Sequence, residues 1–373
     1  MTRRRDCNLR KLVFYIDSMK RGGAQRVMMN LCEHFAENSY QVVLINDYPS
    51  DENESVYKLS PIIKRVYLQP KYTRNPIVNN VIRIVKLRRI LKYEKPDIAL
   101  SFLAGPNIRL LLSATGLKQK TAVSVRNDPN KEYAKSGIKK TIARKLFELA
   151  DGCVFQTEEA RAYFTERVRQ KSAVILNPVD EKFYKVKRRP QAGLIVTAGR
   201  LVKQKRQDVL ITAFKLIEES NPEAKLLIYG EGPLMSQLVE QINTLELNKR
   251  VSLQGNISDI EDALSKGSVF VLTSDYEGMP NALMEAMAVG LPCISTDCPC
   301  GGPRELEGGT ESIMLVECGD INGIVHSLNS ILKDNAYSEK LGISAKERAN
   351  YFKDHVIYEK WERYLETICG KSV

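Results

Sequence analysis

The sequence lacks any apolar stretch long enough to cross a bilayer as a helix, which argues against an integral membrane protein. Its basic start, MTRRRDCNLRK, is followed by an apolar run of only five residues, Leu12–Ile16, which ends at Asp17. A run this short does not make the apolar core of a signal peptide, and it fits a buried first strand. We therefore expect a cytoplasmic protein.

Metal-binding and disulfide patterns are also missing. The eight cysteines are scattered through a long chain without framework spacing, which indicates reduced thiols. Cys293, Cys298 and Cys300 lie close together, but no histidine is near and no second CxxC exists, so we expect no metal. Aromatic residues make up 7% of the chain and do not alternate with basic ones, so nucleic acid is not the expected partner.

Acidic residues are scarce in the first half of the chain. Residues 1–180 carry a net charge of +15 and residues 181–373 carry −4, which together give the net charge of +11 of the whole chain. This asymmetry indicates an anionic partner for the first half. The most basic stretch, Lys71–Lys95, has apolar residues at roughly helical spacing. It reads equally well as a docked surface helix with solvated charges or as a helix lying on anionic lipid head groups.

Short β-rich runs alternate with helical patterns along the chain, which predicts two doubly wound parallel α/β domains. We place the first domain at residues 1–184 and the second at 185–373, because YKVKRRPQAG, Tyr184–Gly193, is a polar and basic seam. The last helix, about 351–368, either stays with the second domain or crosses back to the first. The predicted strands are Leu12–Ile16, Gln41–Ile45, Ile98–Phe102, Ala122–Arg126, Cys153–Gln156, Ala173–Leu176, Leu194–Ala198, Lys225–Tyr229, Val251–Gln254, Val269–Thr273, Cys293–Ser295 and Ile313–Val316.

Two stretches suit phosphate binding. In DSMKRGGAQRV, Gly22 and Gly23 follow the first strand and open a helix, where backbone N–H groups can meet an anion. The stretch is not GxGxxG, so the dinucleotide fingerprint is absent. In TAGRLVKQK, Arg200 and Lys205 follow a strand, and two cations at a strand's carboxyl end can neutralise a diphosphate. A plain turn and a solvated loop are the competing interpretations.

The stretch EGMPNALMEAMAVGLP places two acids around the start of a short helix. Glu277 and Gly278 follow a buried strand, Pro280 suits the first helical turn, and Glu285 lies over one turn into the helix. We expect unsatisfied N–H groups at Asn281, Ala282 and Leu283. A sugar hydroxyl, a phosphate and a ribose diol could be bound in that order. The alternative is that Glu277 caps the helix and Glu285 is exposed.

Together, EGMPNALMEAMAVGLP, GRLVKQK and GGAQRV resemble the family 4 retaining glycosyltransferases of GT-B fold, and the resemblance covers nearly the whole chain. CPCGGPREL, Cys298–Leu306, and SVRNDP, Ser124–Pro129, resemble bacterial members that build capsule, O-antigen or N-glycan repeat units. The resemblance implies two Rossmann-like domains facing across a cleft, with the last helix crossing back to the first domain. It also implies a nucleotide-sugar donor. We expect this donor to be UDP-linked and the acceptor to be a polyprenyl-diphosphate-linked saccharide.

The resemblance further implies roles for single residues. Arg200 and Lys205 would hold the donor diphosphate without a metal or other cofactor, and Gly22 and Gly23 would close on it from the first domain. Glu285 would accept the ribose hydroxyls, and Glu277 would face the donor sugar. Separately from the resemblance, the basic charge of the first domain leads us to expect a protein that works on the inner face of the cell membrane, with this domain on anionic lipid.

One departure concerns the acceptor side. Many relatives place a histidine near the donor sugar in the first domain, but here Arg126, Asn127 and Asp128 follow the fourth predicted strand instead. Asp128 or Arg126 is the candidate for that role, and Glu158 is a further candidate. The rival functions are a nucleotide-sugar epimerase or hydrolase of the same architecture and a non-catalytic basic binding module.

Overall fold

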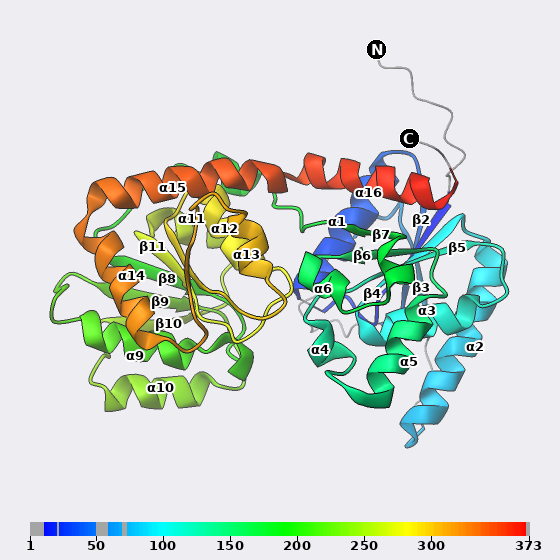
Figure 1. Ribbon diagram of the computed structural model, residues 1–373, viewed down its shortest axis with the longest axis horizontal. Coiled ribbons are helices and arrows are strands. Elements are labelled where there is room, and N and C mark those ends of the chain that lie inside the picture. The colour runs from blue at the N-terminus through cyan, green and yellow to red at the C-terminus, as the bar shows by residue number, and fades with distance from the viewer. Residues whose placement is uncertain (1–10, 21, 50–58, 69–72, 371–373) are drawn as a thin grey trace, which may run out of the picture. The chain divides into compact units, whose positions relative to one another are not determined.

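The computed structural model describes residues 11–20, 22–49, 59–68 and 73–370. The chain divides into two compact units (Figure 1): unit 1 is Met1–Leu176 with Ile357–Val373, and unit 2 is Asn177–Val356. Cys7 and the first two residues of the basic stretch Lys71–Lys95 lie outside the described residues. No helix in the described part of the chain is both long and apolar enough to cross a membrane.

Unit 1 is built on a parallel sheet whose described strands run in the order β3-β2-β1-β4-β5-β6-β7. The central strands are continuous apolar runs that are buried on both faces, as expected for a parallel sheet covered by helices. The strands are β1 Lys11–Tyr15, β2 Gln41–Asn46, β3 Lys64–Tyr67, β4 Ile98–Phe102, β5 Lys120–Ser124, β6 Gly152–Phe155 and β7 Ser172–Val174. The helices are α1 Gly23–Glu37, α2 Pro76–Glu94, α3 Ala104–Ala114, α4 Pro129–Glu132, α5 Gly137–Phe147, α6 Glu158–Ala162 and α7 Glu166–Arg169.

Unit 2 has a second parallel sheet, in the order β10-β9-β8-β11-β12-β13. Its core packs the apolar faces of α9, α10 and α14 against β8, β9 and β11. The strands are β8 Leu194–Ala198, β9 Lys225–Tyr229, β10 Val251–Gly255, β11 Val269–Leu272, β12 Cys293–Thr296 and β13 Met314–Val316. The helices are α8 Lys182–Lys185, η1 Lys203–Lys205, α9 Gln207–Ile217, α10 Met235–Thr244, α11 Ile260–Lys266, α12 Asn281–Val289, α13 Gly302–Glu307, α14 Ile321–Lys333, α15 Asn335–Ala349 and η2 Asn350–Phe352. The last helix, α16 Asp354–Ile368, begins in unit 2 and continues into unit 1.

Each strand predicted from the sequence has a counterpart in one of the two sheets, within two residues at either end. The prediction missed β3, whose sequence is KRVY. This strand lies at the edge of the sheet and is half exposed, so it needs neither the apolar run nor the clean alternation on which the prediction depends.

The two units divide between Leu176 and Asn177, ahead of the predicted boundary at 184/185. Hydrogen bonds to a segment far along the chain explain the difference. The Val179 N–H donates to the Phe352 carbonyl at 2.9 Å, and the Tyr184 hydroxyl donates to the Ala349 carbonyl at 2.7 Å. These bonds tie Val179 and Tyr184 to η2 and to the end of α15, and both elements belong to unit 2.

The end of the chain, from Ile357 onward, belongs to unit 1. Trp361 is fully buried and packs against Phe102 of β4, with ring centroids 5.9 Å apart. The Tyr364 hydroxyl accepts from the Cys153 N–H at 2.7 Å and donates to the Lys171 carbonyl at 2.7 Å. A Cβ on Gly152 would lie 2.7 Å from this hydroxyl, so the glycine leaves room for α16 to lie directly on β6.

Candidate active site

The predicted donor residues of unit 2 follow the two strands at which the strand order reverses. From the centre of the sheet, β8, β9 and β10 follow one another toward one edge, and β11, β12 and β13 follow one another toward the other edge. Ligands of open α/β sheets bind outside the carboxyl ends of the strands at such a switch point. Arg200 and Lys205 lie in the loop after β8, and Glu277 lies in the loop after β11. The topology therefore brings these three residues to the same edge of the sheet.

Lys205 and Glu277 form an ion pair through Nζ and Oε1. The same Oε1 accepts a hydrogen bond from the Ser274 hydroxyl at 2.6 Å. The pair is largely shielded from water, because the side chains of Lys205 and Glu277 are only 16% and 9% exposed. These two contacts hold the Glu277 carboxylate in one orientation. Helix α12 has no side-chain hydrogen bond at its N-cap, so the capping interpretation of Glu277 is wrong.

Arg200 differs from Lys205 in that its side chain is exposed and has no intramolecular hydrogen bond or ion pair within the described residues. Its carbonyl is fixed, because the Gln207 side chain donates to it at 3.1 Å. The backbone is thus anchored while the guanidinium is available to a ligand. This state suits a residue that binds a phosphate through paired N–H groups.

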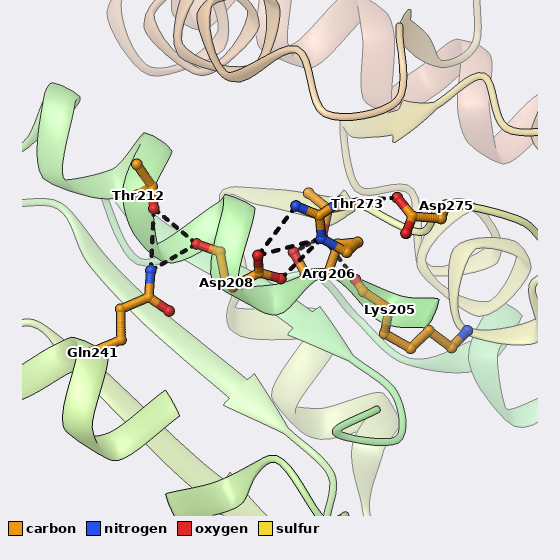
Figure 2. Close-up of polar contacts among 7 residues, drawn as sticks. All are labelled: Lys205, Arg206, Asp208, Thr212, Gln241, Thr273 and Asp275. Carbon is orange, nitrogen blue, oxygen red and sulfur yellow. Dashed lines mark hydrogen bonds and ion pairs between the residues drawn. The ribbon is translucent and has the colours of Figure 1, made fainter. Parts of the chain in front are cut away.

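The loops that carry Lys205 and Glu277 are hydrogen-bonded to each other. The Gln204 side chain donates to the Tyr276 carbonyl at 2.7 Å, and the Asp275 N–H donates to the Gln204 carbonyl at 2.8 Å. Figure 2 shows the Thr273 hydroxyl between the two loops, 3.0 Å from the Lys205 carbonyl and 2.9 Å from the Arg206 carbonyl. These contacts set the position from which Lys205 reaches Glu277.

Arg206 completes this junction in a left-handed backbone conformation, with φ 47° and ψ 41°. Its guanidinium pairs with Asp208 and Asp275, each at 3.2 Å (Figure 2). With Asp208 and Asp275 it lines a cavity of about 390 Å³ on the side facing α10, and Arg200, Lys205, Glu277 and Glu285 are not among the lining residues. The cavity is therefore separate from the predicted donor residues.

The backbone of Arg206 gives a testable prediction. Glycine adopts a positive φ without strain and the ion pairs are partly exposed, so Arg206→Gly should change the free energy of unfolding by less than about 1 kcal/mol. A β-branched valine is strained there, and Arg206→Val should cost about 1–3 kcal/mol and lower turnover. Thermal unfolding of both variants tests this. Equal losses in the two would show that the side chain, and not the backbone, matters at this position.

Helix α12 carries the second acid of the motif. Glu285 is buried, so the exposed alternative for this residue is wrong. The structure gives the N–H groups of Asn281 and Ala282 no intramolecular acceptor within the described residues. The Leu283 N–H, which we expected to be unsatisfied, donates to the Pro280 carbonyl at 3.1 Å, because Pro280 is the N-cap and not the first helical residue. Two free donors remain at the start of the helix.

The site residues predicted in unit 1 lie on different elements, with Gly22 and Gly23 at the start of α1 and Glu158 on α6. Gly22 is the N-cap of α1 and Gly23 its first residue, and neither has a positive φ, so no backbone conformation there requires glycine. Their part in donor binding stays a prediction. Glu158 lies on α6 with an exposed side chain and pairs with Arg161 at 3.2 Å. This is an ordinary surface pair and lends no support to an acceptor role.

Arg126, Asn127 and Asp128 follow β5. Asp128 is buried and caps α4, since its carboxylate accepts from the N–H and the side chain of Asn130 at 2.9 and 3.0 Å. This local role accounts for the residue type without a catalytic one. Arg126 is buried with its guanidinium 4.5 Å from the Phe102 ring centroid, and burial lowers its pKa to about 9.

Sequence reasoning missed Glu132, which lies beside Arg126. Burial raises the pKa of the Glu132 carboxyl to about 7, and its Oε2 has no donor within the described residues. The folded protein thus keeps the proton that the unfolded chain releases above about pH 4.5. As pH rises to about 7 the stability should fall by on the order of 2–3 kcal/mol, and it should not fall further above that pH.

Glu132→Gln should remove this part of the pH dependence, because a glutamine does not ionise. The measurement is the melting temperature of both proteins at pH 5 and pH 8, with the exposed Glu37→Gln variant as control. An unchanged difference between the two pH values in Glu132→Gln would contradict the buried, protonated state.

Ser274, Asn177 and Gly302 were also missed. The Asn177 side chain donates to the Asn281 Oδ1 at 2.6 Å and so orients the first residue of α12. Gly302 packs on the loop of Glu277, and the missing Cβ would lie 2.0 Å from the Gly278 carbonyl oxygen. Such contacts join segments far apart in the chain and leave no local pattern.

Of the clustered cysteines, Cys298 lies near the Lys205–Glu277 pair. Cys298 is buried, and this burial together with the nearby Glu277 carboxylate raises the pKa of its thiol well above the usual range. Cys293 and Cys300 are buried as well. The described residues contain no group of three or more His, Cys, Asp or Glu side chains arranged to hold a metal ion.

Comparison with known proteins identifies the family. Residues 179–348 match the family model "Glycosyl transferases group 1", and residues 21–183 match the model "Glycosyltransferase Family 4". The protein belongs to the family 4 glycosyltransferases. Together the two matches cover both units, and the family resemblance read from the motifs is confirmed.

Two relatives of this family 4 glycosyltransferase come from Campylobacter jejuni. One is the GalNAc-alpha-(1->4)-GalNAc-alpha-(1->3)-diNAcBac-PP-undecaprenol alpha-1,4-N-acetyl-D-galactosaminyltransferase, 25% identical over 370 residues that cover 96% of this chain and 99% of the relative. The other is the N-acetylgalactosamine-N,N'-diacetylbacillosaminyl-diphospho-undecaprenol 4-alpha-N-acetylgalactosaminyltransferase, 26% identical over 377 residues that cover 96% and 100%.

A solved structure with the same fold is HepE from Anabaena in complex with UDP. Its TM-score is 0.77 at 16% identity, and the match covers 96% of this chain and 100% of that chain. The predicted GT-B class, with two Rossmann-like parallel sheets, is thus confirmed for this glycosyltransferase.

Proposed function

We propose that this glycosyltransferase moves a sugar from a UDP-sugar to a saccharide on a polyprenyl diphosphate, with retention of the anomeric configuration. The observation that carries the proposal is the shielded Lys205–Glu277–Ser274 cluster at the switch point of unit 2, followed by the buried Glu285. Cations and free N–H groups can bind the phosphates of a nucleotide-sugar, and carboxylates can accept hydrogen bonds from its hydroxyls.

In this proposal Arg200 and Lys205 neutralise the departing diphosphate, and the N–H groups of Asn281 and Ala282 bind its oxygens. Positive charge placed where negative charge develops lowers the barrier, so no metal is needed for that step. Glu285 accepts the ribose hydroxyls. Glu277 accepts hydroxyls of the donor sugar, and its pairing with Lys205 keeps the sugar and the phosphate contacts in one rigid arrangement.

The donor and the acceptor are proposed from related proteins. Both Campylobacter relatives are named for acceptors on diphospho-undecaprenol, and HepE, of the same fold, binds UDP. Both relatives are also named for α-linkages, and an α-linked product from an α-linked nucleotide-sugar means retention. The role would be in capsule, O-antigen or glycan repeat-unit assembly, at the cytoplasmic face of the cell membrane where a polyprenyl acceptor lies.

The test is nucleotide release from UDP-, GDP- and ADP-sugars in EDTA, with and without polyprenyl-linked saccharide. We expect release from one UDP-sugar that depends on the lipid-linked acceptor, and an α-linked product by NMR. Release without acceptor would favour a nucleotide-sugar hydrolase instead. A requirement for added metal or a β-linked product would contradict the mechanism, and absence of both nucleotide binding and release would leave the non-catalytic module.

Arg200→Ala should mainly raise the KM for the donor, by about 10-fold or more, since a charged hydrogen bond to phosphate contributes about 1.5–3 kcal/mol. Because the Arg200 side chain holds no other residue in place, the melting temperature should not change. Initial rates at varied donor concentration test this. A fall in kcat with an unchanged KM would instead mean that Arg200 interacts with the donor only in the transition state.

A further inference from the structure

Unit 1 exposes apolar side chains on neighbouring helices. On α2, Ile77 and Val81 are 73% and 54% exposed, although both belong to the apolar pattern that predicted a docked helix. Only the second half of that pattern is docked, because Leu87 and Leu91 are fully buried. On α5, Ile138 and Ile142 are 77% and 60% exposed. Each pair is spaced i, i+4, so its members lie on one side of their helix.

The two helices lie on either side of α3, which packs against both (Figure 1). α3 itself exposes Leu112. Three adjacent helices on one side of the sheet therefore present apolar side chains to solvent. Monomeric soluble proteins seldom leave such sets uncovered unless a partner binds there.

The charge around these apolar residues has one sign. α2, α3 and α5 contain ten Lys or Arg residues, five, one and four respectively, and a single acid, Glu94. Glu94 is buried and paired with Lys11 and Lys64, each at 2.7 Å. The exposed Arg89, Lys92 and Lys139 have no internal partner within the described residues. The surface thus offers cations with no exposed carboxylate on the same helices.

We propose that the solvent-facing sides of α2 and α5 form a docking surface for a bilayer with anionic head groups. Ile77, Val81, Ile138 and Ile142 enter the boundary between head groups and acyl chains, and Arg89, Lys92 and Lys139 contact the phosphates. A surface that is apolar and cationic at once matches an interfacial lipid layer, whereas a protein partner would also need acidic residues opposite the exposed cations. The inference deepens the proposed function, since a polyprenyl acceptor lies in a bilayer.

The experiment is cosedimentation of the full chain with vesicles of phosphatidylcholine alone or mixed with phosphatidylglycerol. We expect binding only to the mixed vesicles, and loss of it as ionic strength rises from about 0.1 M to about 1 M, which shortens the Debye length from about 10 Å to about 3 Å. Ile138→Asn with Ile142→Asn should weaken binding at least about tenfold. The matched control is the double variant Leu216→Asn with Ile343→Asn in unit 2, where the original side chains are 58% and 54% exposed. This control should bind the vesicles as the unchanged chain does.

Charge is tested separately. Replacing Arg89, Lys92 and Lys139 by Gln should weaken binding about tenfold or more, whereas the same change of net charge at the exposed Lys249, Lys333 and Lys340 of unit 2 should not. Equal binding to neutral vesicles, or equal loss in both sets of variants, would overturn the proposal. So would self-association of the chain that the Ile138→Asn and Ile142→Asn changes abolish, because the surface would then be a contact between copies.

Activity separates this inference from the proposed function. The α5 variants should keep their rate on a short-chain, water-soluble acceptor and lose rate on an acceptor embedded in anionic vesicles. Absence of transfer to either acceptor, with vesicle binding intact, would refute the proposed function and leave the docking surface standing. Unchanged rates on the embedded acceptor would overturn the docking surface alone.

Discussion

Glu277→Gln should lower kcat by about 10²–10³-fold, and it should also lower the melting temperature, because a shielded ion pair loses one partner. The substitution removes the negative charge that pairs with Lys205 and weakens an acceptor of the Ser274 hydroxyl. Lys205 would then be left partly buried without its counter-ion and would lose its fixed position at the switch point. The measurement is acceptor-dependent nucleotide release at saturating donor.

Lys205→Ala should cause a loss of similar size, and the double variant should be scarcely worse than either single one. Groups that act as a unit are not additive, because removing one already disables the other. The matched control is the exposed pair of Lys182 and Glu261 in the same unit, 2.8 Å apart, whose variants should keep full activity. If the fold-loss of kcat in the double variant equalled the product of the two single fold-losses, Lys205 and Glu277 would act independently.

Gly302→Ala should destabilise the protein by about 1–3 kcal/mol and lower kcat by about 10–100-fold. The added Cβ would lie 2.0 Å from the Gly278 carbonyl oxygen and 3.2 Å from Pro280 Cδ. The first contact is with backbone, which cannot rotate away, so the loop between Glu277 and helix α12 must move. Glu277 and the N–H groups of Asn281 and Ala282 would move with it.

Thermal unfolding and initial rates measure both effects. The control is Gly105→Ala in α3 of unit 1, where the nearest atom to a new Cβ is Arg109 Nη1 at 3.2 Å and not a backbone atom. That variant should keep kcat, and its loss of stability should be smaller than that of Gly302→Ala, because the added contact is looser and alanine favours a helix. A Gly302→Ala protein with unchanged kcat would mean that the position of this loop does not limit the reaction.

Much of the fold could be predicted because its strands are local patterns. Runs such as LVFYI and LIVTA are buried from end to end in a parallel sheet, so each is visible in a short window of sequence. The edge strand β3 was missed, because its sequence KRVY has neither an apolar run nor an alternating pattern of burial. The division between units was missed for another reason, because hydrogen bonds from Val179 and Tyr184 to η2 and to the end of α15 connect distant segments.

In the candidate site too, residues in local patterns were found from the sequence, and residues that matter through contacts between distant segments were missed. Arg200, Lys205, Glu277 and Glu285 were found because each follows a strand or lies on a short apolar helix, and these features are local. Ser274, Asn177, Gly302 and Glu132 were missed because their importance comes from contacts with partners or from burial. Asp128 and Glu158 were selected for residue type and place after a strand, yet one caps α4 and the other forms a surface pair.

The sequence by itself therefore determined the fold class, the family and the strand-end residues that make up the predicted donor site, since periodicity and motif spacing are properties of the chain. Only the tertiary structure decided that Lys205 pairs with Glu277, that the Pro280 carbonyl accepts a hydrogen bond from the Leu283 N–H, and that Ile77 and Val81 of α2 are exposed while Leu87 and Leu91 are buried. The physical reason is that distance, burial and hydrogen-bond partners depend on which segments meet in space. A helical pattern shows which residues share a face, but not whether another helix covers it.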